Sequence, residues 1–151
     1  MTENKKEDLD LIKACEDGYL EKVKSIINSG VNINKKYEDR KNVTALIVAS
    51  NNGNLDIVKC LVENGACINA QDNSGYTSLM YALDMGHLEI AKYLIEEGAD
   101  VSAKNNADWT ALIFASIRSN GLEIVKLLIE RDADIINAQI NNGWTALMSA
   151  S

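Results

Sequence analysis

Proline is absent from this chain of 151 residues, and histidine and phenylalanine each occur once. Without proline, no proline-rich linker divides the chain into domains. The three cysteines, Cys15, Cys60 and Cys67, form no Cys-x-x-Cys pair, and the opening sequence MTENKKEDLD is not followed by the apolar core of a secretion signal. An odd number of cysteines without such a signal indicates free thiols, so we expect an intracellular, cytoplasmic protein.

Positive charge is also scarce. The chain has 15 Lys and Arg against 22 Asp and Glu, which gives a net charge of −7. Nucleic acids and anionic membrane surfaces attract clustered basic side chains, so we expect neither as a partner. No apolar run reaches the length of a membrane span. The acidic balance keeps the chain soluble and mildly favours a basic partner.

Motifs for catalysis and metal binding are missing too. The only histidine is His87, in GHLE, and neither GxGxxG nor the phosphate loop GxxxxGK[ST] occurs. Three scattered cysteines and one distant histidine do not form the four-ligand cluster of a structural zinc site. We therefore expect no enzymatic activity, cofactor, metal or small-molecule substrate. A redox protein that uses a cysteine is an alternative that ordinary thiol reactivity would dismiss.

What the chain does contain is a repeated segment of 33 to 35 residues. Four copies begin at a threonine: Thr44, Thr77, Thr110 and Thr145. A more degenerate copy starts near Leu9. In each unit the threonine suits a helix N-cap, a short apolar helix follows, and a longer helix has apolar residues at helical spacing. One such unit is too small to bury its apolar face, so we expect the units to stack.

Glycines mark the same two places in each unit. The first separates the two helices and stands at Gly18, Gly53, Gly86 and, displaced by an insertion, Gly121. The second follows the longer helix and stands at Gly30, Gly65 and Gly98, with Asp132 in the fourth unit. This second position fits the left-handed conformation that closes many helices.

Period, motif and helix pair together resemble the ankyrin repeat. The opening Thr-Pro-Leu-His-x-Ala motif of that family appears as TALIVA, TSLMYA, TALIFA and TALMSA, which keep Thr, Leu and Ala. The tract GHLEIAKYLIEEGADVSA, from 86 to 103, is close to the family's form. The resemblance implies an all-α solenoid of stacked antiparallel helix pairs joined by hairpin loops. It would be a single domain over 1–151, with units at about 9–43, 44–76, 77–109 and 110–144 and a partial unit at 145–151.

The resemblance and the period also make local predictions. Short helices are expected near 45–52, 78–85 and 111–118. The resemblance assigns His87 to a structural turn. It further implies hairpin hydrogen bonds for Asn34, Asn69 and Asn137.

Ankyrin-like stacks bind other proteins through hairpin tips and the exposed side of the short helices. The resemblance therefore implies a non-catalytic protein-interaction module that binds an unidentified protein partner on a concave face. The binding positions, carried over one by one, are Tyr76, Tyr81, Met85, Trp109, Phe114, Ile117, Arg118 and Trp144. The matching positions of the second unit include Asn51 and Asn52, and Glu16 and Asp17 make the first unit acidic.

Two interpretations of the aromatic residues remain open. In the first, Met85, Trp109, Phe114 and Ile117 form an exposed hot spot for the partner. In the second, the residues before each threonine only pack on the next hairpin, and Tyr81 and Phe114 are half-buried between helices.

The C-terminal end of the repeat pattern is incomplete. The chain stops after one short helix, and no second helix covers Leu147. A solenoid normally ends in a polar capping repeat. We expect a monomer that has this uncapped face as a second contact surface. The alternative function is the targeting or substrate-recruiting region of a longer enzyme or adaptor, such as a ubiquitin ligase or a kinase, truncated at residue 151.

Overall fold

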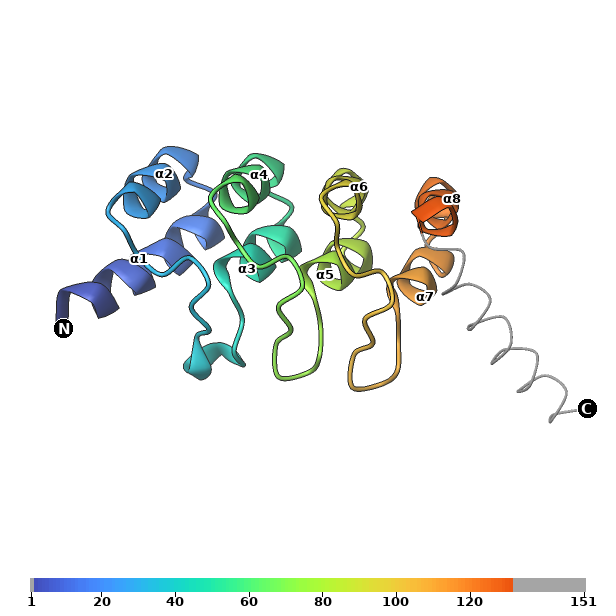
Figure 1. Cartoon of the computed structure of the whole chain (residues 1–151), viewed down its shortest axis with the longest axis horizontal. Coiled ribbons are helices and arrows are strands. Elements are labelled where there is room, and N and C mark those ends of the chain that lie inside the picture. Colours follow the sequence, from blue (N-terminus) through green and yellow to red (C-terminus); the bar gives the residue numbers. More distant parts are fainter. Residues whose placement is uncertain (1, 132–151) are drawn as a thin grey trace, which may run out of the picture.

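The computed structural model describes residues 2–131. Within them, eight α-helices lie in two parallel rows, with long loops projecting from one side (Figure 1). The inner row contains α1 (Thr2–Asp17), α3 (Ala45–Asn52), α5 (Ser78–Asp84) and α7 (Ala111–Ser116). The outer row contains α2 (Leu20–Asn28), α4 (Leu55–Glu63), α6 (Leu88–Glu96) and α8 (Leu122–Arg131). Asp132, Asn137, Trp144, Leu147 and the partial unit 145–151 lie outside the described residues.

The order of the elements confirms the predicted repeat solenoid. Each inner helix packs against its own outer helix and against the next inner helix in the row (Figure 1). The described part of the chain contains no β-strand, and its one β-bridge joins Tyr37 to Val43. The predicted helix at 45–52 is confirmed, and those at 78–85 and 111–118 end at Asp84 and Ser116.

Threonine caps explain where the inner helices begin. The Oγ1 atoms of Thr44 and Thr77 each accept a hydrogen bond of 3.3 Å from the backbone N–H three residues later. Such a bond satisfies one of the N–H groups that the first helical turn leaves without an intrahelical partner. The cap therefore fixes the start of the second and third units, as the sequence predicts; Thr110 is the N-cap residue of α7 but makes no such side-chain bond to its first turn.

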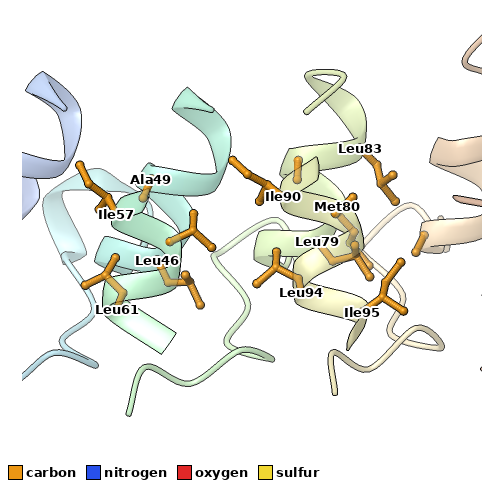
Figure 2. Close-up of a cluster of buried hydrophobic side chains, with 14 of the residues drawn as sticks. Leu46, Ala49, Ile57, Leu61, Leu79, Met80, Leu83, Ile90, Leu94 and Ile95 are labelled. Atoms are coloured by element: carbon orange, nitrogen blue, oxygen red, sulfur yellow. The ribbon is translucent and has the colours of Figure 1, made fainter. Parts of the chain in front are cut away.

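The repeat motif keeps its leucine and its alanine because both lie in the core. Leu46 and Leu79 are 1% exposed, and Ala49, at the end of its motif, is completely buried. The larger side chains fill the space between inner and outer helices, as Figure 2 shows for Leu61 and Leu94. Burying one such leucine stabilises the fold by about 1.5–3 kcal/mol. The small alanine lets neighbouring inner helices approach closely.

Glycines at the ends of the outer helices have the predicted conformation. Gly65 and Gly98 have φ angles of 92° and 94°, in the left-handed region that residues with a Cβ rarely adopt. Gly121 separates α7 from α8, as predicted, but unlike Gly18, Gly53 and Gly86 it does not have a φ in the left-handed range. A Cβ there would lie 2.0 Å from the carbonyl oxygen of Ala115. Close packing, not backbone conformation, requires this glycine.

Hydrogen bonds between successive units confirm the predicted asparagine contacts. The Oδ1 atom of Asn34 accepts a bond of 2.7 Å from the N–H of Cys67, and that of Asn69 accepts one of 2.7 Å from the N–H of Asp100. The Nε2 atom of His87 lies 3.0 Å from the carbonyl oxygen of Asn51, which agrees with a structural position at the turn. Each contact ties one unit to the next.

The first unit departs from the sequence prediction in two ways. Its inner helix begins at Thr2, well before Leu9, and buries Asp8, whose carboxylate lies 2.7 Å from the Nζ atom of Lys35. The loop that follows α2 also contains a short 3₁₀ helix, η1 (Glu38–Arg40), which the repeat pattern does not predict. Arg40 of η1 forms an ion pair with Glu16 at the end of α1.

Candidate protein-binding surface

Four of the predicted binding residues form a continuous row of rings. The ring of Tyr76 lies 4.9 Å from that of Tyr81 and 5.5 Å from that of Phe114, measured between centroids. The ring of Trp109 lies 5.2 Å from that of Phe114, in an edge-on orientation. We call Tyr81, Tyr76, Phe114 and Trp109 the aromatic row. It connects α5 to the loop that precedes α7.

Two buried polar side chains hold the aromatic row in place. Asp72 accepts a hydrogen bond of 3.0 Å from the backbone N–H of Tyr76, and Asn105 accepts one of 3.0 Å from that of Trp109. Asp72 also accepts a bond from the hydroxyl of Tyr81; burial, together with this bond, raises the pKa of that phenol. Sequence reasoning missed both polar residues. The sequence does contain a signal for them: each lies four positions before an aromatic residue, and the two polar residues are 33 positions apart, which is the length of one repeat.

The structure corrects the prediction that Phe114 is an exposed part of the hot spot. Its side chain is 1% exposed, because the rings of Tyr76 and Trp109 pack against it from two different loops. A partner therefore has no access to Phe114, and its contribution to a binding surface would be to support Trp109. Trp109 is 39% exposed, while Tyr76 and Tyr81 are half-buried.

The remaining predicted residues lie at the other end of the inner helices. Met85 and Ile117 directly follow α5 and α7 and are 51% and 61% exposed. Arg118 is half-buried, and its guanidinium lies beside Gly86. Trp109 comes directly before the N-cap of α7 and Ile117 is its C-cap, so the whole helix lies between them. Trp109 and Ile117 therefore lie at opposite ends of α7, and we refer to Met85 and Ile117 as a second exposed patch. Trp144 lies outside the described residues.

Two of the three cysteines are buried thiols with a raised pKa. All are free; Cys15 and Cys60 are buried, and Cys67 is exposed. Burial raises the pKa of Cys15 to about 12 and also raises that of Cys60. A raised pKa leaves little of the reactive thiolate at neutral pH.

Residues 2–131 contain neither a metal-binding cluster nor a membrane-spanning helix. No three His, Cys, Asp or Glu side chains in this range are grouped so that they could hold a metal ion. No helix in the same range is long and apolar enough to span a membrane.

Comparison with known families agrees with this architecture. A family model described as ankyrin repeats in three copies matches residues 11–105, and a second, described as ankyrin repeats in many copies, matches residues 82–129. The chain therefore belongs to the ankyrin-repeat family, as its motifs predict. Ankyrin repeats are generally protein–protein interaction modules and are typically non-catalytic. A search among curated proteins found no match to this sequence.

Proposed function

We propose that this chain binds a protein partner on the inner helices and loop bases of the third and fourth units, and that it holds this partner without catalysing a reaction. The observation that carries the proposal is the exposure of three large apolar side chains in these units. Met85, Trp109 and Ile117 are 51%, 39% and 61% exposed. Apolar side chains grouped on one face mark interaction sites in many proteins.

The contrast with the second unit supports this location. In the second unit, Asn52 stands at the position of Met85 and Asn51 at the position of Ile117, and both are polar. Solubility alone would favour polar side chains in all units. The aromatic row also holds the Trp109 ring against Phe114, so little side-chain entropy is lost when a partner packs on it.

The test compares variants inside and outside the proposed surface. Trp109→Ala and Ile117→Ser remove apolar contacts within it, and Ile129→Ser is the matched control. Ile129 is 46% exposed but belongs to α8 in the outer row. Each variant is first checked for an unchanged helical content and a cooperative thermal transition.

The original chain and each variant are then used to capture proteins from a lysate. Candidate partners are the proteins that the original chain and Ile129→Ser retain and that both surface variants lose; these are purified and titrated. We expect Trp109→Ala to weaken binding by about 2 kcal/mol or more, because aromatic anchors dominate such interfaces. If both surface variants bind the same proteins with unchanged affinity, the partner docks elsewhere and the proposal is wrong.

A further inference from the structure

A hollow of about 530 Å³ lies where three inner helices end. Its lining comes from the C-terminal ends of α1, α3 and α5 and the residues just after them: Glu16, Asp17, Gly18, Asn51, Asn52, Asn54, Met85 and His87. Met85 belongs to the exposed patch described above, so the hollow continues the proposed binding surface toward the first unit. Along this surface, apolar side chains thus give way to polar and acidic ones.

The electrostatics of the hollow favour a cation. The C-terminal ends of three helices, which carry a partial negative charge, border the hollow, but so do the N-caps of α4 and α6, Asn54 and His87, where the partial charge is positive. The side chains of the lining therefore decide the sign of its charge. Basic side chains usually occupy the last turn of a helix, yet α1, α3 and α5 have none there. Glu16 and Asp17 instead add two carboxylates at the end of α1. The lining contains these two carboxylates and no lysine or arginine, so it favours a cation.

Two arginines limit where a cation can bind. Arg40 already forms an ion pair with Glu16. The guanidinium of Arg118 lies beside Gly86: its Nη1 atom is 3.5 Å from the position that a Cβ atom added to Gly86 would take. Asp17 is exposed and has no ion pair within the described part of the chain. The free negative charge is therefore at Asp17, on the opposite side of the hollow from Met85.

The floor of the hollow is held by contacts between the helix ends. The side-chain amides of Asn52 and Asn54 donate to the carbonyl oxygens of Glu16 and Cys15, at 3.5 Å and 3.3 Å. His87 contacts the carbonyl oxygen of Asn51, as described above. A site fixed in this way binds a ligand with a smaller loss of entropy.

Building on the proposed function, we infer that the partner presents an extended segment with a lysine or arginine beside Asp17 and an apolar side chain over Met85. Neighbouring packed helices lie about 8–10 Å apart, so α1 and α5 are separated by about 16–20 Å. An extended chain covers this distance in about five to six residues. The overall charge of −7 attracts the same kind of segment.

The experiment uses the whole chain and a displayed library of random peptides of about sixteen residues, long enough to span the surface. Peptides selected on the original chain are synthesised and titrated against Asp17→Lys, Ile117→Ser and the control Ile129→Ser. Asp17→Lys places a cation at a helix C-terminus, where the dipole favours it, so the fold is kept.

We expect the selected peptides to share a basic residue and an apolar residue at the stated spacing. Asp17→Lys should weaken their binding by about tenfold or more, and added salt should reduce this difference. Ile129→Ser should leave the affinity unchanged.

Three outcomes would overturn the inference. Peptides that bind the surface, as judged by sensitivity to Ile117→Ser, but lack a basic residue or ignore Asp17→Lys would refute it and leave the proposed function standing. Failure to enrich any peptide, or binding insensitive to every surface variant, would count against both. Self-association of the chain that Ile117→Ser abolishes would show that the occupant is a second copy.

Discussion

The side-chain oxygen of Asn69 accepts a hydrogen bond of 2.7 Å from the backbone N–H of Asp100, in the following unit. Asn34 makes the equivalent bond to Cys67 one unit earlier. In a solenoid each unit contacts only its neighbours, so the coupling between units depends on contacts of this kind. A side chain here satisfies a backbone group that the loop itself leaves without a partner.

Replacing Asn69 by alanine should therefore lower the free energy of unfolding by about 1 kcal/mol, the usual contribution of one such hydrogen bond. Urea denaturation followed by circular dichroism measures the change. Asn28→Ala is the matched control, because Asn28 is exposed at the end of α2 and makes no hydrogen bond through its side chain among residues 2–131. Equal stability of the two variants would show that the Asn69 contact contributes nothing.

Gly98→Val should destabilise the protein by roughly 1 kcal/mol or more, since its φ of 94° is unfavourable for a β-branched residue. A Cβ at Gly98 would have no neighbour within 4 Å, so the cost comes from the backbone and not from a clash. Gly65, with a φ of 92°, should behave in the same way.

Asparagine tolerates the left-handed conformation, which provides a control for this cause. Gly98→Asn should lose clearly less stability than Gly98→Val in the same thermal melts. If the two substitutions are equally damaging, the backbone explanation is wrong.

The three cysteines should differ in their reactivity toward a thiol reagent. At neutral pH we expect Cys67 to react like the thiol of a free peptide, because it is exposed. Cys15 should react only when the protein unfolds, because burial raises the pKa of its thiol to about 12 and shields the sulfur. Mass spectrometry after timed labelling separates the sites. Faster labelling of any cysteine than of the free-peptide thiol would instead support the redox alternative.

The sequence predicted the parts of the fold that depend on local chemistry. Thr44 and Thr77 cap helices because each hydroxyl accepts a hydrogen bond from the backbone N–H three residues later. Leu46 and Leu79 are buried because they repeat at the interval of the units. The Asn69 contact was carried over from the family resemblance and is confirmed. Each of these features is contained within one unit or repeated between neighbouring units.

The features that the sequence did not predict depend on packing between different segments. Whether Phe114 is exposed is decided by the rings of Tyr76 and Trp109, which come from two separate loops. Gly121 is constrained by the carbonyl group of Ala115, on the other side of a turn. No pattern of residue types gives these distances, so the sequence could not show that Phe114 is buried or that close packing requires a glycine at 121.

The last prediction distinguishes two roles within the aromatic row: Phe114 supports its neighbours, and Trp109 contacts the partner. Phe114→Ala should lower the free energy of unfolding by about 3–5 kcal/mol, because it empties a fully buried site. Phe114→Leu fills most of that volume and should cost less than about 1.5 kcal/mol. Trp109→Ala removes a ring that is 39% exposed, so its effect on stability should be clearly smaller than that of Phe114→Ala.

Binding should show the opposite order. A partner that packs on Trp109 should lose about 2 kcal/mol or more of binding free energy with Trp109→Ala. With Phe114→Leu it should lose much less, because the indole keeps a support. Calorimetric titration of both variants with an identified partner measures this difference. If Phe114→Leu weakens binding as much as Trp109→Ala while the fold remains intact, then Phe114 contacts the partner directly and the buried position assigned to it does not persist in the complex.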